Sequence, residues 1–98
     1  MRVELSARAE LNLAHMEATY SLPADTRERI RGSLEYVGLF PQIGRALEGE
    51  WQPLRMWVGP SRWMLFVYEV LEGEDLVLVV TIRDARSADS PTSPTGRP

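Results

Sequence analysis

The chain has 98 residues, a formal net charge of −3 and no cysteine, and 44% of its residues are hydrophobic. This length is near the lower end of the range in which one hydrophobic core supports a fold, so we expect a single domain. The lack of cysteine excludes a disulfide framework and a thiolate metal site, and one histidine cannot assemble a metal centre alone. We therefore expect no metal and no other cofactor.

The acidic balance excludes a protein that holds nucleic acid over its whole surface, so any contact with RNA or DNA must be local. All 11 basic residues are arginine. They indicate either bidentate recognition of phosphate or carboxylate, or a GC-rich genome that encodes arginine wherever a positive charge suffices. No apolar stretch follows Met1 as in a signal peptide, and none is long enough to span a bilayer. We expect a soluble cytoplasmic protein that is not exported.

The first elements are a short strand and a helix. Polar and apolar residues alternate over residues 2–5, which predicts a half-buried strand. Ser6 is placed to cap the following helix, whose apolar residues recur at three- and four-residue steps as far as Tyr20. Leu22-Pro23 ends this segment.

A second helix follows at once. Asp25, with Glu28 three residues later, has the pattern of a capping box, and Ile30, Leu34 and Val37 continue at helical spacing. Residues 38–41 close the helix. The two amphipathic helices form a hairpin whose apolar stripes need a partner surface.

Three segments rich in aromatic and β-branched residues supply that surface, at 54–58, 62–71 and 76–83. Turn-forming stretches at Gly59-Pro60 and 72–75 separate them and predict an antiparallel meander. The fold class is therefore α+β, in the order β-α-α-β-β-β, with a helical hairpin packed on a mainly antiparallel four-stranded sheet. Residues 1–86 form the predicted domain. Residues 87–98, rich in Ser, Thr and Pro, are predicted to be a disordered tail.

Tight turns at these two places would pair Arg55 with Met64, Tyr68 with Val79 and Met64 with Arg83, and would sort the sheet into two faces. The face predicted to hold the helices is apolar and carries Leu54, Met56, Val58, Trp63, Leu65, Val67, Leu71, Leu76, Leu78, Val80 and Ile82. The opposite face carries Arg55, Trp57, Arg62, Met64, Phe66, Tyr68, Thr81 and Arg83. Arginines interleaved with aromatic rings suit phosphates and stacked bases. They also suit an exposed sheet on which arginines pair with Glu69 or Asp84 for solubility, and both interpretations stay open.

Several motifs occur in an ordered series, and the most telling is the Pro-x-x-Gly-Arg element after the second helix. The series is Phe40-Pro41-Gln42-Ile43-Gly44-Arg45-Ala46-Leu47, Leu54-Arg55, Tyr68-Glu69 and Ile82-Arg83-Asp84-Ala85-Arg86. Over residues 2 to about 87 the chain resembles the RelE/ParE toxin superfamily. The resemblance implies the toxin of a type II toxin–antitoxin system, a growth inhibitor neutralised by a cognate antitoxin whose flexible segment wraps around it.

The superfamily divides by target. RelE-like members cut mRNA on the ribosome, for which Arg55, Arg62 and Arg83 are the candidate catalytic residues. ParE-like members poison DNA gyrase and need no catalytic group. Leu65 stands where RelE-like enzymes carry an arginine, and the remaining carboxylates, Glu69 and Asp84, would lie on the opposite face as a general base.

The missing base favours the gyrase hypothesis over the nuclease, so whether the protein is an enzyme stays open. A third hypothesis is a decayed family member that acts only as a binding module. In each case we expect a protein, ribosome or mRNA partner and no membrane or small-molecule substrate. The target-binding candidates are Arg45, Arg55, Trp57, Arg62, Tyr68, Arg83 and Arg86.

Overall fold

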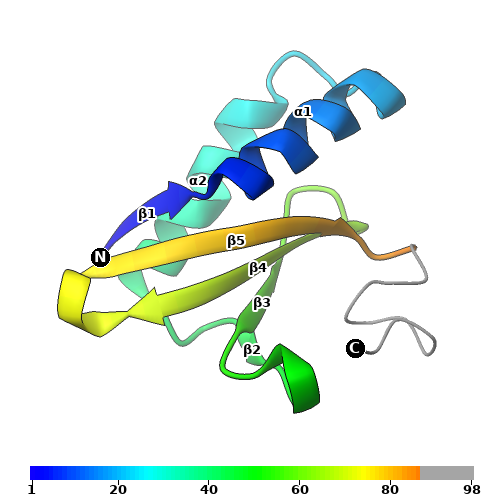
Figure 1. Cartoon of the computed structure of the whole chain (residues 1–98). Helices are drawn as coiled ribbons and strands as arrows, with labels where there is room; N and C mark the ends of the chain where they lie inside the picture. The colour runs from blue at the N-terminus through cyan, green and yellow to red at the C-terminus, as the bar shows by residue number, and fades with distance from the viewer. Residues whose placement is uncertain (87–98) are drawn as a thin grey trace.

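The computed structural model describes residues 1–86, and the predicted tail at 87–98 lies outside the described residues (Figure 1). The elements are β1 (Arg2–Leu5), α1 (Ala7–Tyr20), α2 (Thr26–Leu39), β2 (Arg45–Ala46), η1 (Gly49–Trp51), β3 (Arg55–Val58), β4 (Met64–Leu71), η2 (Glu72–Glu74) and β5 (Leu76–Asp84). The strand order is β1-β5-β4-β3-β2, with β1 parallel to β5 and the other pairs antiparallel. The predicted α+β fold is confirmed, and the two-residue strand β2 adds a fifth strand to the sheet.

The two helices begin in different ways. The Ser6 side chain accepts a hydrogen bond from the Ala9 amide at 3.1 Å, as predicted for a capping serine. Asp25 is the N-cap residue of α2 but makes no side-chain capping bond. Its φ of −90° and ψ of 8° lie outside the extended region from which a capping side chain reaches the first turn. The predicted capping box is therefore wrong, although the helix itself is confirmed.

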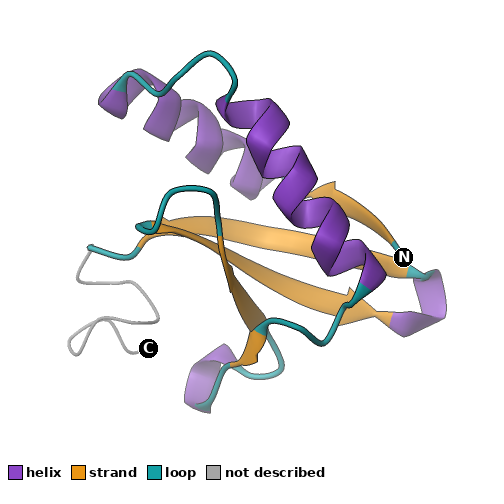
Figure 2. Ribbon diagram, turned by 180° about the vertical axis from the view of Figure 1, so that it is seen from behind, coloured by secondary structure: helices purple, strands orange, loops and turns teal. Residues whose placement is uncertain are grey.

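Both helices cover one face of the sheet, and η1 lies on the side away from them (Figures 1 and 2). We call these sides the helix face and the helix-free face. The core between helices and sheet consists of Ala9, Leu13, Met16, Ile30, Leu34, Val37, Met64, Phe66, Tyr68, Val77, Val79 and Ile82. Within residues 1–86, no helix is long and apolar enough to cross a membrane.

The predicted assignment of the two faces is wrong for β3, for β4 and for the first part of β5, where Val77 and Val79 pack against the helices instead of Leu76, Leu78 and Val80. Met64, Phe66 and Tyr68 pack against the helices, whereas Leu65 and Val67 lie on the helix-free face. All five residues are at most 2% exposed. Because both faces of this strand are apolar and buried, alternation alone does not indicate which face holds the helices.

The hairpin registers explain the rest of the pattern. Arg55 pairs with Tyr68 instead of Met64, because residues 59–63 form a longer loop closed by the bond from the Gly59 amide to the Met64 carbonyl. The predicted pair of Tyr68 and Val79 is confirmed, but an irregularity between Val67 and Tyr68 shifts the remaining pairs by one residue.

The shift at the bulge keeps Arg83 on the helix-free face, because it now pairs with Leu65. Asn12 of α1 provides the hydrogen-bond acceptor for β5 at this bulge. Its side-chain oxygen accepts bonds from the Thr81 hydroxyl at 2.8 Å and from the Ile82 amide at 3.0 Å. The bulge is therefore fixed by a helix side chain rather than by the sheet alone.

Candidate functional site

Arg45, Glu69 and Arg83 all lie on the helix-free face. Arg45 pairs with Met56, which pairs with Val67, and directly opposed residues project from the same face. Glu69 lies two residues beyond Val67 on β4. Since neighbouring strands are about 4.8 Å apart, three strand spacings separate Arg45 from Arg83 by about 14 Å across the sheet. Two cations and a carboxylate thus surround the apolar centre of this face.

The loop between β2 and β3 packs across this face. The Arg83 guanidinium carbon lies 5.8 Å from the centre of the Trp51 ring. Trp51 belongs to η1 in this loop, whereas Arg83 is on β5, two strands away from β3 in the sheet. The Trp51 indole N–H is buried and has no hydrogen-bond partner within residues 1–86. An unpaired buried donor beside a guanidinium is suited to an anionic acceptor.

Arg55 and Tyr68 are not on the helix-free face, contrary to the predicted assignment of faces. The fully buried Tyr68 hydroxyl donates to the Pro41 carbonyl at 2.7 Å and accepts from the Gly44 amide at 3.0 Å. Arg55 donates to the carbonyls of Gln42 and Gly44. Burial raises the pKa of Tyr68, while the Gly44 amide and the Arg55 charge act in the opposite direction. Both side chains are therefore committed to the loop that follows α2.

The three tryptophans lie in different places and do not form one patch. Trp57, predicted on the open face, lies on the helix face, where its Nε1 donates to the Ser33 hydroxyl at 3.0 Å. Its ring stacks on Tyr36 at 6.3 Å between centroids. Trp63 contacts Tyr20 at the end of α1, with 5.0 Å between ring centroids. Two of the three rings are thus used to hold the helices on the sheet.

Arg86 is held in a box formed by Tyr20, Trp63 and Asp84. Its guanidinium lies 4.7 Å from the Trp63 ring centre and 5.2 Å from that of Tyr20. Its Nε and Nη2 donate to the Asp84 carboxylate at 2.9 Å, and the Tyr20 hydroxyl donates to the same carboxylate at 2.8 Å. Bonding to Arg86 lowers the pKa of Asp84 to about 2. Arg86 thus fastens the end of β5 to α1, and its guanidinium is already engaged.

Arg62, the remaining candidate, is exposed in the loop between β3 and β4 and is not part of either strand. The predicted set of seven target-binding residues is therefore dispersed. Arg45 and Arg83 share the helix-free face, Arg55, Trp57 and Tyr68 support the helix side, and Arg86 ties down β5.

Sequence reasoning missed two members of the site. Glu69 was placed on the wrong face together with the rest of β4. Trp51 is not among the predicted site residues, because no local pattern indicates that its loop reaches Arg83. Within residues 1–86, no group of three or more acidic, histidine or cysteine side chains is placed to hold a metal ion.

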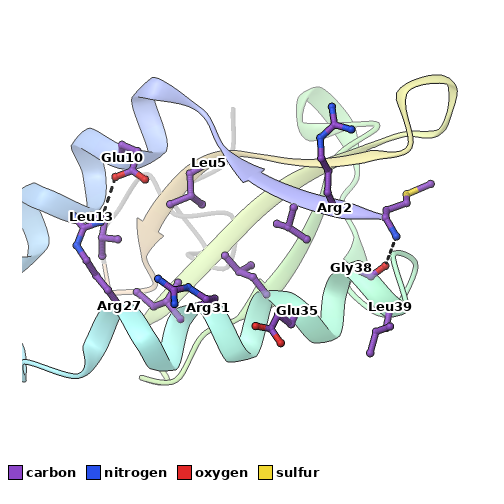
Figure 3. Close-up of a pocket in the computed structure, with 13 residues that line it drawn as sticks. Arg2, Leu5, Glu10, Leu13, Arg27, Arg31, Glu35, Gly38 and Leu39 are labelled. Atoms are coloured by element: carbon purple, nitrogen blue, oxygen red, sulfur yellow. Dashed lines mark hydrogen bonds and ion pairs between the residues drawn. The ribbon is translucent and has the colours of Figure 1, made fainter.

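A cleft of about 530 Å³ lies between the edge strand β1 and the two helices (Figure 3). Its apolar lining includes Val3, Leu5 and Leu34, and charged side chains of both signs line its rim. At the end of α2 Leu39 also lines it and is 72% exposed. A mostly apolar cleft with a charged rim suits a segment of another polypeptide.

Comparison with known proteins gives matches only among solved structures, because no protein-family model and no curated protein sequence matches the chain. A chain of the intact Escherichia coli RelBE toxin–antitoxin complex is similar with a TM-score of 0.61 and 22% identity, over 88% of this chain and 98% of that one. The isolated E. coli RelE toxin gives a TM-score of 0.61 and 20% identity, over 88% and 85% of the two chains. A double arginine-to-alanine variant of E. coli RelE bound to a peptide of the antitoxin RelB gives 0.63 and 18%, over 90% and 86%. The chain therefore has the fold of the RelE toxins.

Proposed function

We propose that this protein is the toxin of a type II toxin–antitoxin pair and that it acts as a RelE-like endoribonuclease on ribosome-bound mRNA. The observation that carries the proposal is the likeness to RelE, which extends over 88% of this chain and 85% of the isolated E. coli RelE toxin. The sequence favoured a gyrase poison because a general base was missing. That objection weakens once Glu69 lies on the same face as Arg45 and Arg83.

The chemistry follows from these three side chains. Glu69 accepts the proton of a ribose 2′-hydroxyl, whose oxygen attacks the adjacent phosphorus while the bond to the 5′-oxygen breaks. The products are a 2′,3′-cyclic phosphate and a 5′-hydroxyl, the latter protonated by water. Arg45 and Arg83 stabilise the negative charge that builds up on the phosphate oxygens in the transition state.

Primer extension on ribosomes programmed with a defined mRNA tests this mechanism. We expect the wild-type protein to cut the message and Glu69→Gln to slow cutting at least about a hundredfold, as expected for loss of a general base. Glu28→Gln, a change to an exposed carboxylate on α2, is the matched control and leaves the rate unchanged. Growth arrest without cut transcripts would refute the nuclease proposal.

Gyrase inhibition is the second candidate, and one observation favours it. Tyr36, Leu39, Phe40 and Ile43, at the end of α2 and in the loop that follows it, are between 39% and 72% exposed. Exposed apolar side chains gathered in this way are typical of a protein contact that needs no chemistry. Induction of the DNA-damage response by the wild-type protein, lost in Phe40→Ser, would support gyrase as the target.

We also propose that a segment of the antitoxin occupies the cleft beside β1. Leu39→Glu places a charge at its edge without disturbing the core and should weaken antitoxin binding about tenfold or more. Leu11→Glu on α1 is the control, because Leu11 is also 72% exposed and does not line the cleft. Equal binding by both variants would place the antitoxin elsewhere. Antitoxin binding without growth inhibition would instead indicate a decayed toxin.

A further inference from the structure

The loop at residues 41–44 connects α2 to the edge strand β2 and is held at both ends by one buried hydroxyl. Tyr68 donates to the Pro41 carbonyl and accepts from the Gly44 amide, so a single atom spans the loop. The Tyr68 side chain is fully buried in the core. The loop is thus attached to β4, the strand with the most completely buried side chains.

Arg55 holds the same loop from β3. Its Nη1 donates to the Gly44 carbonyl at 2.8 Å and to the Gln42 carbonyl at 3.2 Å, and its Nη2 donates to the Gln42 side-chain oxygen at 3.2 Å. A planar guanidinium that bridges several acceptors fixes their relative positions, which a lysine ammonium does less well. Arg55 pairs with Tyr68 across the two strands, so the two anchors act side by side.

Glycine is required where the loop meets these anchors. A Cβ on Gly44 would lie 2.8 Å from the Met56 carbonyl oxygen and would collide with the Tyr68 hydroxyl. The Pro-x-x-Gly-Arg motif therefore places its glycine at the point of closest approach, and Arg45 follows immediately.

The position of Arg45 depends on this arrangement, because β2 has only two residues and lies at the edge of the sheet. So short a strand restricts its side chains weakly, and Arg45 is itself exposed. We infer that Arg55 and Tyr68 are positioning residues that lock the loop at 41–44 and thereby direct Arg45 onto the helix-free face to meet the scissile phosphate. This inference rests on the proposed function for the role of Arg45.

A double-mutant cycle on programmed ribosomes tests whether Arg55 contributes to mRNA cutting through Arg45. Arg45→Ala and Arg55→Ala should each slow mRNA cutting about tenfold, as expected for loss of a charge-assisted contact. The double variant should be no slower than the single ones, because Arg55 acts through Arg45. Independent effects that multiply to about a hundredfold would overturn the inference. Arg55→Lys, which restores one donor, should recover part of the rate, and Arg29→Ala on the far helix is the charge-matched control.

Amide hydrogen exchange and backbone chemical shifts test whether Arg55 and Tyr68 hold the loop at 41–44, and they need no cellular target. Arg55→Ala and Tyr68→Phe should speed exchange of the Gly44 amide and shift the Arg45 amide resonance, while the core amides of β4 and β5 remain protected. Unchanged Gly44 exchange in both variants would overturn the inference. If the wild-type protein cuts no mRNA, the proposed function fails, and the same cycle measured as growth arrest decides whether Arg55 acts through Arg45. If growth is also unaffected, the inference that these residues serve a toxin site is overturned.

Discussion

Replacing Asp84 by asparagine removes the anion at the centre of the box that holds Arg86. The Asp84 carboxylate is 15% exposed and accepts bonds from Arg86 and from the Tyr20 hydroxyl. Its pKa is about 2 in the folded protein against an ordinary value of 3.8. At 1.36 kcal/mol for each unit of pKa, this difference corresponds to at most about 2.4 kcal/mol of folding free energy.

The partner side chain reduces this figure. The Arg86 side chain is 59% exposed, so solvent screens its attraction for the carboxylate. We therefore expect Asp84→Asn to lower the free energy of unfolding by about 1–2 kcal/mol at pH 7.

The pH dependence has a defined direction. A carboxylate whose pKa is lowered by folding stabilises the protein fully above its unfolded pKa, and this contribution is lost as the pH falls to the folded pKa. The stability difference between wild type and Asp84→Asn should therefore be constant above about pH 5 and should shrink between pH 4 and pH 2.

Urea unfolding followed by tryptophan fluorescence measures this difference at each pH. Glu17→Gln is a matched control, because Glu17 also pairs with an arginine, Arg27, but both side chains are at least 33% exposed. It should change stability by less than about 0.5 kcal/mol. An Asp84→Asn protein as stable as the wild type at pH 7, or a difference that persists unchanged to pH 2, would refute the assignment of this stabilisation to the Asp84 carboxylate.

Three further substitutions test the packing around the site. Gly44→Ala forces a Cβ against the Tyr68 hydroxyl and should lower stability by about 2–4 kcal/mol; a shift in Tm below about 2 °C would contradict the close approach. Asn12→Ala leaves the Thr81 hydroxyl and the Ile82 amide without their acceptor, which should cost about 1–3 kcal/mol and speed exchange of the Ile82 amide; unchanged exchange would refute the role of Asn12 at the bulge. Ser6→Ala removes the helix cap and a bond to the Val80 carbonyl, so calorimetry should show a loss of about 1–2 kcal/mol, and no loss would indicate that water replaces the cap.

Most elements of the fold are predictable from local patterns. The first strand, both helices and the three long strands appear at the predicted places, because helical and strand periodicities were each unambiguous. The short strand β2 was missed because two residues carry no periodicity. Its position depends instead on Tyr68 and Arg55, which are remote in sequence from the loop that they anchor.

The candidate site was less predictable, since it depends on which face of the sheet the helices cover. Two local features of β4 and β5 determine which side chains lie on which face. The buried run from Met64 to Tyr68 is apolar on both sides, so its pattern does not show which side faces the helices. The bulge beside Tyr68 shifts the pairing of Ile82 and Arg83 by one residue but leaves Val79 opposite Tyr68. Arg83 therefore lies on the helix-free face as predicted, but because of the bulge, which the sequence does not indicate. Arg55 lies on the helix face and Glu69 on the helix-free face, each opposite to its predicted side.

The parallel pairing of β1 with β5 has a consequence for synthesis of the protein. In the described sheet, β1 is bonded to β5 alone, and Arg2 pairs with Leu76. During synthesis, β1 leaves the ribosome first but cannot pair until β5, the last strand, has been made. Until β5 has been made, α1 also lacks the surface of Val77 and Val79 on which it packs. Pairings of such long range form late in folding. The helix-free face, with Arg83 on β5, cannot assemble on a nascent chain that lacks this final strand, so translation of the protein is nearly complete before its own site exists.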